Sequence, residues 1–432
     1  MTADAATGTR PRRIVLVLPT ETYRAADFIA AAAEVGVEVV VATEHRPPLA
    51  TEMESRLVVV DLDRPEEAAA RIAAMADRTP IDAVVGVDDQ GVLTAAHAGE
   101  ILGLAHNPPD AVAATRDKAQ MRGVLASWGV RQPDFRVLVP GADVAEAAAA
   151  VGCPCVLKPL SLSASTGVIR ADTPADAVGV AERIRQILAD HGRSPDEALL
   201  IERFVPGAEV SLEALLHDGD LQVLALFDKP DPLDGPYFEE TIYVTPSRLG
   251  GPEQTAVLAA AAEACRALGL RDGPVHAELR VGPGADGEVA AWVLEVAARS
   301  IGGLCSRVLR FGTGISLEQL IVEHAVGRDV ADSVRTDGAA GVMMLPIPRS
   351  GVLTGVDGLD AARGVAGVTG VEITATIGRR IDALPDGGRY LGFVFARGDT
   401  PDSVESALRR AHSELTVTIV DAPRSVDGRT PA

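Results

Sequence analysis

Lysine is nearly absent from this chain of 432 residues, which has only three, Lys118, Lys158 and Lys229, among 40 basic residues. Asparagine occurs once, at Asn107. A chain this rich in alanine, glycine and arginine is typical of a GC-rich genome, in which a surface lysine drifts readily to arginine. The lysines that remain are then enriched at sites where a planar guanidinium group cannot replace a compact ammonium group. Composition alone therefore singles out three positions.

Long apolar runs and cysteines are also scarce. No apolar run approaches the roughly 20 residues that span a bilayer, and the short run from Ile14 to Leu18 is typical of a first strand rather than of a secretory leader. Cys153 and Cys155 form a C-x-C pair with no second pair to complete a zinc site. We expect the four cysteines to be reduced core thiols of a cytoplasmic protein. The net charge of −21 argues against nucleic acid or an anionic membrane as the main partner.

Three regions with different patterns of predicted secondary structure follow one another along the chain. Residues 13–105 alternate strand and helix patterns, which predicts a parallel sheet with helices on its faces. The first strand is followed by PTETYR without a G-x-G-x-x-G pattern, so a dinucleotide-binding site is not expected. A helix is predicted over 109–129, and antiparallel-looking strands run to about residue 296. An α+β region begins near residue 336 and ends with a helix over 400–415 and a strand.

A loop of small residues follows a predicted strand in PCVLKPLSLSASTGVIR, with Lys158 at the end of that strand. Backbone N–H groups and hydroxyls such as that of Ser165 can cover a phosphate chain there, while the lysine supplies charge. The alternative is an ordinary serine-rich hairpin. Lys118 stands beside Asp117 near a helix start, where the alternative is a solvated charge.

A strand and a turn follow in LLIERFVPGAEVSLEALL, which contains the pair Glu202-Arg203 before Phe204 and Val205. Such a hinge is a reasonable place for an adenine, whose edge bonds to backbone N–H and C=O groups. The next strand carries three polar residues on one face: Glu209, Ser211 and Glu213.

Two glutamates interrupt the apolar strands GPVHAELRV and VAAWVLEV. If Asp286-Gly287 forms a two-residue hairpin turn, Glu278 lies directly opposite Glu295, with Cβ atoms roughly 5 Å apart. Like charges there repel unless a cation lies between them, and an all-oxygen site favours magnesium over zinc. On this register Trp292 and Leu294 face away from Glu295. The alternative is two exposed surface glutamates.

Read in order, the segments RDK, VLKP…STGV, IERFVPGAEVSLE, HAELRV and LEVAARSIGG resemble the motifs of the ATP-grasp superfamily, and the resemblance covers nearly the whole chain. It implies α/β and α+β architecture: a pre-ATP-grasp parallel-sheet domain (1–106) and an ATP-grasp domain (107–333) with a lid subdomain over about 135–205. A C-terminal α+β domain (334–422) resembles that of the L-amino acid ligase branch, and a flexible tail (423–432) follows.

The resemblance also implies site residues. Lys118 and Lys158 contact ATP phosphates, and Glu278 and Glu295 bind one or two magnesium ions, with manganese as a substitute. Arg299 acts with Lys158 in catalysis by stabilising the reacting carboxyl oxygens. The remaining implied nucleotide contacts are Ser165, Glu202, Phe204, Val205 and Glu209. The implied substrate-facing residues are Glu240, Tyr243, His276, Arg299, Gly302 and Gly303. For His276, a structural role with its hydrogen bonds satisfied is an equal alternative.

Two features depart from the family pattern. Ala297 stands where many relatives carry an asparagine, two residues after the second metal glutamate. The phosphate loop has Leu162 and Ala164 in place of the usual glycines.

The function implied by the resemblance is an ATP-dependent ligase that activates a carboxylate as an acyl phosphate and joins it to an amine, an amino acid above all. The rivals are an ATP-grasp ligase with another acceptor (a carrier thiol, a ribosylamine or bicarbonate) and a non-catalytic nucleotide-binding module. The expected partners are small-molecule carboxylate and amine substrates, with neither nucleic acid nor membrane, and a homodimer is one expected assembly.

Overall fold

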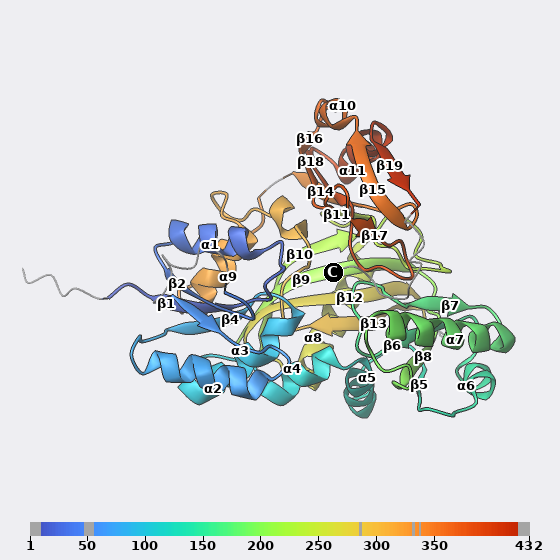
Figure 1. Ribbon diagram of the computed structural model, residues 1–432, viewed down its shortest axis with the longest axis horizontal. Coiled ribbons are helices and arrows are strands. Elements are labelled where there is room, and N and C mark those ends of the chain that lie inside the picture. Colours follow the sequence, from blue (N-terminus) through green and yellow to red (C-terminus); the bar gives the residue numbers. More distant parts are fainter. Residues whose placement is uncertain (1–9, 47–55, 285–286, 331–332, 337, 422–432) are drawn as a thin grey trace, which may run out of the picture.

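The computed structural model describes residues 10–46, 56–284, 287–330, 333–336 and 338–421 (Figure 1). The predicted tail over 423–432 lies outside the described residues. The predicted domain boundaries stay a prediction. The eight-stranded sheet includes strands from both sides of the predicted boundary between residues 333 and 334.

The N-terminal unit is a parallel sheet with strand order β3-β2-β1-β4, which confirms the predicted parallel sheet. Its strands are β1 Arg13–Val17, β2 Glu38–Thr43, β3 Leu57–Val59 and β4 Ala83–Gly86. Its helices are α1 Ala25–Glu34, α2 Pro65–Ala76 and α3 Asp89–Leu102. A Cβ at Gly91 would lie 2.3 Å from Val17 O, so glycine lets the first turn of α3 pack directly on β1.

The single helix predicted over 109–129 is wrong. Two helices, α4 Pro109–Arg116 and α5 Lys118–Ser127, meet at Asp117. Asp117 has extended backbone angles, and its carboxylate accepts hydrogen bonds from the N–H groups of Ala119 (2.8 Å) and Gln120 (3.0 Å). An aspartate in this position caps a new helix. Lys118 is therefore the first residue of α5, in agreement with its predicted position near a helix start.

A four-stranded antiparallel sheet with the order β5-β8-β6-β7 occupies the predicted lid region. Its strands are β5 Phe135–Leu138, β6 Cys155–Pro159, β7 Ile169–Ala171 and β8 Leu199–Arg203. Helices α6 Val144–Val151 and α7 Pro174–Asp190 pack on it through fully buried residues that include Ala148, Ile184 and Ile201. The strand β6 carries Lys158 near its end.

The central sheet has eight antiparallel strands in the order β13-β12-β9-β10-β11-β14-β18-β16. The strands before residue 300 are β9 Ala208–His217, β10 Asp220–Asp228, β11 Ile242–Thr245, β12 Gly273–Pro283 and β13 Val289–Ala297. The others are β14 Ala339–Leu345, β16 Val368–Ile373 and β18 Gly392–Gly398. Because β11 pairs with β14, the C-terminal region extends the central sheet.

The remaining elements flank this sheet. Helices α8 Gly251–Leu268 and α9 Leu317–Ala325 and the short 3-10 helix η2 Cys305–Val308 belong to the middle of the chain. The C-terminal region adds α10 Leu359–Arg363, α11 Pro401–Ser413 and a three-stranded sheet ordered β17-β15-β19. The strands of that small sheet are β15 Gly351–Asp357, β17 Arg380–Ile381 and β19 Thr416–Val420. Figure 1 shows them above the central sheet.

The two faces of β9 and β12 differ in polarity, as alternation in a strand requires. On β12, Val275, Ala277 and Leu279 share one apolar core with Val257 and Ala261 of α8. The opposite face is polar. It pairs Glu213 with His276, Ser211 with Glu278 and Glu209 with Arg280 across the two strands.

The predicted pairing of Glu278 with Glu295 is found, but the predicted reason for it is wrong. Asp286 lies outside the described residues, and the flanking pair Pro283–Val289 is one residue out of the predicted register, which would pair Pro283 with Ala290. A β-bulge in β13 corrects the register between the turn and Glu278. Because of this bulge Val293 enters the core in place of Leu294, and Leu294 lines the same cleft as Glu295. The predicted faces of Trp292 and Leu294 were therefore wrong.

One apolar core joins all three parts of the chain: Ile14 and Phe28, Leu320 of α9, and Val342 and Phe393 of the C-terminal region.

Within the described stretches of chain, no helix has both the length and the apolar character needed to cross a bilayer. All four cysteines are free thiols. Cys153 is exposed, which corrects the expectation that all four lie in the core.

Candidate active site

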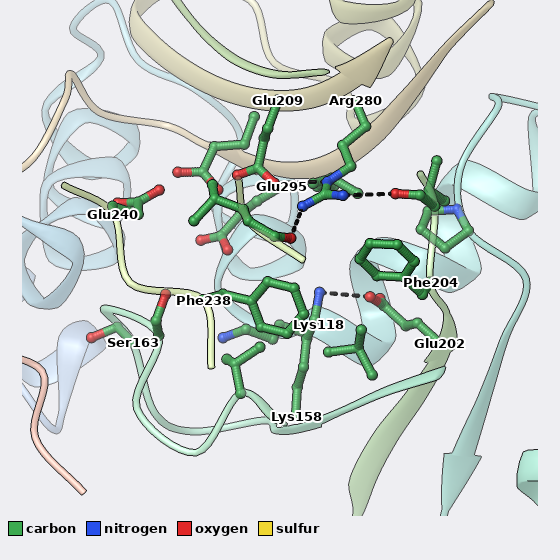
Figure 2. Close-up of a pocket in the computed structure, with 18 of the residues that line it drawn as sticks. Lys118, Lys158, Ser163, Glu202, Phe204, Glu209, Phe238, Glu240, Arg280 and Glu295 are labelled. Carbon is green, nitrogen blue, oxygen red and sulfur yellow. Dashed lines mark hydrogen bonds and ion pairs between the residues drawn. The ribbon is translucent and has the colours of Figure 1, made fainter. Parts of the chain in front are cut away.

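A cleft with about 780 Å³ of open space lies between the lid sheet and the polar face of the central sheet (Figure 2). Its lining includes ten of the predicted site residues: Lys118, Lys158, Ser165, Glu202, Phe204, Val205, Glu209, Glu240, Glu278 and Glu295. Five predicted site residues lie outside this lining: Tyr243, His276, Arg299, Gly302 and Gly303.

Two lysines form the cationic side of the cleft, and Figure 2 shows them facing the glutamates across it. Lys158 Nζ lies 2.6 Å from Glu202 Oε2, and Lys118 Nζ donates to Leu162 O at 2.8 Å. Arg122 Nε also donates to Glu202, at 2.5 Å. Burial opposes ionisation of Glu202, but the two cations outweigh burial and lower its pKa to about 2. Glu202 therefore holds Lys158 in place. Its carboxylate already pairs with Lys158 and Arg122, so a contact between Glu202 and adenine would have to be made in addition to these two ion pairs.

The loop over 160–168 is fixed at both ends and strained in the middle. Glu197 Oε1 accepts two backbone N–H groups at its start, both at 2.9 Å, and Gly167 N–H donates to Pro385 O at 3.0 Å near its end. Between these anchors Ala164 and Ser165 have φ angles of 51° and 56°. Residues with a Cβ rarely adopt this left-handed conformation. Ala164, which stands where the family usually has a glycine, therefore adopts a backbone conformation that a glycine would adopt without strain.

A stack of cations and rings forms the wall near Val205. The guanidinium carbons of Arg170 and Arg280 lie 4.6 Å and 4.8 Å from the centroid of the Phe204 ring, and the Phe238 ring is 6.4 Å from it. Arg280 also donates to Val205 O (2.9 Å) and to Glu209 (2.9 Å). Arg280 therefore fixes the backbone segment on which the adenine prediction rests.

Lys229 does not itself line the cleft but lies among three glutamates that form its acidic side. Its ammonium group contacts Glu240 and lies 2.9 Å from Glu209 and 3.3 Å from Glu278, with 3% of its side chain exposed. Burial opposes its charge, but the three carboxylates outweigh burial and raise its pKa well above the usual value. Burial and the nearby Glu278 raise the pKa of Glu240 to about 7, although Lys229 opposes them. The third surviving lysine is thus a buried counter-ion.

His276 bridges two glutamates rather than lining the cleft. Its Nδ1 lies 2.5 Å from Glu213 Oε1, and its Nε2 lies 3.3 Å from Glu278 Oε1. Burial favours the neutral ring, but Glu213 and then Glu278 outweigh burial and raise the pKa of His276 to about 9. Burial also opposes the charge on Glu278, but Lys229 and His276 hold the pKa of that carboxyl well below its usual range. This geometry favours the structural alternative for His276.

Arg299 is bound across the interface with the N-terminal unit. Its Nε and Nη2 donate to the two carboxylate oxygens of Asp89, at 2.9 Å and 3.0 Å, and Nη1 donates to Ser300 O at 3.1 Å. A bidentate pair of this kind fixes both the position and the plane of the guanidinium. Asp89 raises the pKa of Arg299 despite burial, so the group stays charged.

Three family descriptions match the chain. Residues 29–106 match the ATP-grasp N-terminal domain, residues 151–308 match the ATP-grasp domain, and residues 343–420 match L-amino acid ligase C-terminal domain 2. The chain belongs to the ATP-grasp family. Its C-terminal region is that of the L-amino acid ligases, as the sequence resemblance implied.

Individual relatives agree with this family. An uncharacterized protein y4rH of Sinorhizobium fredii is 29% identical over 82% of this chain and 75% of its own length. Alanine–anticapsin ligase of Bacillus subtilis is 26% identical over 61% of this chain, a match that spans only 58% of that ligase. The crystal structure of an L-amino acid ligase from Bacillus licheniformis has a TM-score of 0.77 and 24% identity, and covers 96% of this chain and 100% of its own.

The remaining predicted residues of the ATP-grasp site lie beside the cleft. Gly303 has a φ angle of 59°, and a Cβ there would lie 3.0 Å from the Phe393 ring, so this position accepts a side chain poorly. Gly302, next to it, has open space around its Cα. Tyr243 is buried, with its ring centroid 5.2 Å from Lys229 Nζ.

Several residues that line the cleft or hold its side chains in place escaped the sequence analysis. The scarcity of lysine marked Lys229 without a role, and the polar face of HAELRV contained Arg280. Nothing in the sequence marked Asp89, Arg122 or Phe238. Each of these three contributes through a partner that is far away in the chain, as Asp89 does with Arg299 at a separation of 210 residues.

Proposed function

We propose that this ATP-grasp protein is an ATP-dependent ligase that activates a carboxylate as an acyl phosphate and joins it to an amine, above all the amine of an amino acid. The observation that carries the proposal is one cleft with Lys118 and Lys158 on one side and the opposed pair Glu278 and Glu295 on the other. Phosphoryl transfer depends almost entirely on such positioned charges. The L-amino acid ligase C-terminal domain supports amide formation as the outcome.

In the proposed first half-reaction, an oxygen of the substrate carboxylate attacks the γ-phosphorus of ATP, and ADP leaves. Lys158, oriented by Glu202, and Lys118 offset charge on the phosphate oxygens. Arg299, oriented by Asp89, holds the carboxyl group. Activation is necessary because a carboxylate is a poor electrophile.

Magnesium fits the donor set at this site. Glu278 and Glu295 lie opposite each other on adjacent strands, and both line the cleft. The cluster of Glu209, Glu240 and Glu278 oxygens is not counted in this set, because the ammonium group of Lys229 already neutralises it. Hard oxygen donors of this kind suit Mg²⁺, with Mn²⁺ as a substitute. A magnesium ion held there would neutralise phosphate charge. Ala297 adds no oxygen donor to this set.

In the proposed second half-reaction, the amine attacks the acyl carbon and inorganic phosphate leaves. The attacking nitrogen must first lose the proton of its ammonium form. Glu240 belongs to the acidic cluster, contacts Lys229 and lines the cleft. Its carboxylate, whose pKa burial and Glu278 raise to about 7, is proposed to attract the ammonium group and to accept its proton.

The test is incubation of the pure protein with magnesium-ATP and amino acids, singly and in pairs, while ADP, phosphate and product mass are followed. We expect ADP that depends on a pair, with a product whose mass is the sum of the two minus water. ADP release with no condensed product would reassign the acceptor to a thiol, a ribosylamine or bicarbonate.

Two variants separate the proposed site from general damage. Lys158→Ala removes the lysine that Glu202 orients, and we expect turnover to fall by about 100-fold or more. Arg136→Ala, on strand β5 of the same sheet, removes an exposed cation and serves as the matched control. ATP binding and turnover that survive Lys158→Ala would refute the site.

Three further expectations stay predictions: the cytoplasmic location, the absence of nucleic acid or membrane partners, and the homodimer.

A further inference from the structure

A second cluster of chemically competent side chains lies away from the cleft. It consists of His217, the last residue of β9, Asp272 just before β12, and His324 on α9. Glu209 at the start of β9 lines the cleft, whereas His217 ends that strand. At about 3.3 Å per residue the two positions are roughly 26 Å apart. The cluster is therefore separate from the proposed ATP-grasp site.

The three side chains converge. One ligand atom from each of them lies within 4.8 Å of the other two. His324 Nε2 is 3.3 Å from Asp272 Oδ1, and the rings of His217 and His324 are 5.7 Å apart with an interplanar angle of 80°. They come from three different elements, so convergence depends on the tertiary structure.

One ring nitrogen of His324 is buried without a hydrogen-bond partner among the described residues. The side chain of His324 is 5% exposed, and the nitrogen without a partner is Nε2. Asp272 Oδ1 lies 3.3 Å away, but the angle between the two groups does not allow a hydrogen bond. Buried polar nitrogens are almost always paired, so an orphan needs an explanation. A metal ion between His324 and Asp272 would supply the missing partner.

The chain uses its only asparagine to fix the position of Asp272. Asn107 Nδ2 donates to Asp272 O at 2.7 Å, and Asn107 Oδ1 accepts from the N–H groups of Asp272 (2.9 Å) and Arg271 (2.6 Å). The next residue, Gly273, pairs with Leu216 of β9, beside His217. These hydrogen bonds fix the backbone from which the Asp272 carboxylate projects, so that part of the cluster is held in place before any ion binds.

We propose that His217, Asp272 and His324 bind a zinc-class transition metal ion. Two imidazoles and one carboxylate favour such a metal over magnesium or calcium, and water would complete a tetrahedron. Ligands about 2.0–2.1 Å from zinc lie roughly 3.4 Å from each other, which matches the 3.3 Å between His324 and Asp272. The other two separations, each no more than 4.8 Å, would have to shrink by at most about 1.4 Å to reach this value. His217, whose side chain is 80% exposed, is free to turn inward.

The proposed ion would connect α9 to the end of the central sheet. Helix α9 and the residues after it bind the N-terminal unit, since Gln319 donates to Glu34 at 2.5 Å and Arg328 donates to Val35 O at 2.9 Å. Occupancy would therefore strengthen the junction between the sheet and the N-terminal unit. It would not add a group to the cleft.

The test is titration of the full chain with Zn²⁺, followed by calorimetry, and with Co²⁺, followed by visible absorption, in excess Mg²⁺ so that the carboxylates of the cleft are occupied. The background variant Cys153→Ser removes the exposed thiol. We expect one tight equivalent of metal, a tetrahedral Co²⁺ spectrum without sulfur-to-metal charge transfer, and a higher thermal midpoint with Zn²⁺.

Variants locate the metal. His217→Ala, at an exposed position that should not disturb folding, is expected to weaken Zn²⁺ binding at least tenfold and to abolish the rise in midpoint. Asn107→Ala should weaken binding by about 10–100-fold. His45→Ala removes another exposed histidine and should change nothing. Unchanged Zn²⁺ affinity in His217→Ala, or no tight equivalent in the background protein, would overturn the proposal. Neither readout depends on ligase activity.

Discussion

Replacing Lys229 with methionine should destabilise the protein strongly, because it leaves three buried carboxylates without their shared cation. The ammonium group contacts Glu240 and lies 2.9 Å from Glu209 and 3.3 Å from Glu278, with 3% of the side chain exposed. Methionine keeps most of the volume and removes only the charge. Any loss of stability therefore reports electrostatics rather than a cavity.

The expected magnitude comes from the partners that remain. Breaking a buried ion pair by removing one partner costs about 3–5 kcal/mol. At about 2–4 °C per kcal/mol for a domain of this size, the thermal midpoint should fall by roughly 6–20 °C. Glu209 keeps Arg280 and Glu278 keeps His276, so most of the penalty should fall on Glu240.

The double variant Lys229→Met with Glu240→Gln tests this assignment, since it removes the stranded charge together with the cation. We expect it to recover at least half of the lost midpoint. Millimolar Mg²⁺ should also raise the midpoint of Lys229→Met more than that of the parent, because the three carboxylate oxygens lie within 4.8 Å of one another. Differential scanning fluorimetry with and without Mg²⁺ measures both effects.

The matched control is Arg409→Met. Arg409 also contacts two carboxylates, Asp231 at 2.6 Å and Glu405 at 2.9 Å, but its side chain is 43% exposed. Removal of an exposed cation should cost about 1 kcal/mol or less. If Lys229→Met loses no more than this control, or if the double variant is no better than the single one, the buried counter-ion argument is wrong.

Three further predictions concern the proposed ligase. Asp89→Asn should lower kcat by up to about 100-fold through a misplaced Arg299 while KM for ATP stays the same; a matching rise in KM would speak against an orienting role. Glu295→Gln should raise the magnesium concentration needed for ATP binding by about tenfold or more, as seen in a magnesium titration at fixed ATP. The His276–Glu213 contact should stabilise the fold fully below pH 6.5, since the pKa of His276 is raised from 6.5 to about 9, and its contribution, about 3 kcal/mol at most, should be lost as pH rises through 9. Midpoints of parent and His276→Gln across this range should converge at high pH, and a difference that does not change with pH would contradict it.

The sequence by itself determined which segments form strands and helices and which residue types carry the chemistry. Strict alternation placed Glu209 and Glu213 on one face of their strand and His276 and Glu278 on one face of theirs, because successive side chains of a strand point to opposite sides. That the two polar faces coincide was decided by the pairing of β9 with β12. The scarcity of lysine marked Lys158 and the other two lysines, and all three line or adjoin the cleft. These inferences depend only on local geometry and composition, so they needed no knowledge of packing.

Local patterns misled where one residue changes the geometry. Asp117 caps α5 and divides a helix that periodicity alone made continuous. Glu295 lies opposite Glu278 because a bulge compensates for a turn different from the one predicted. A bulge shifts every later side chain to the other face, and no residue type in VAAWVLEV announces it.

Only the tertiary structure decided the partners. Asp89 meets Arg299 across 210 residues of chain, and Lys229 becomes a counter-ion because β9, the segment before β11 and β12 bring three carboxylates around it. Likewise, His217 and His324 acquire a common neighbour in Asp272 only when α9 packs beside the end of β9. An ion pair depends on distance and burial, and both are properties of the packed molecule rather than of any segment of its sequence.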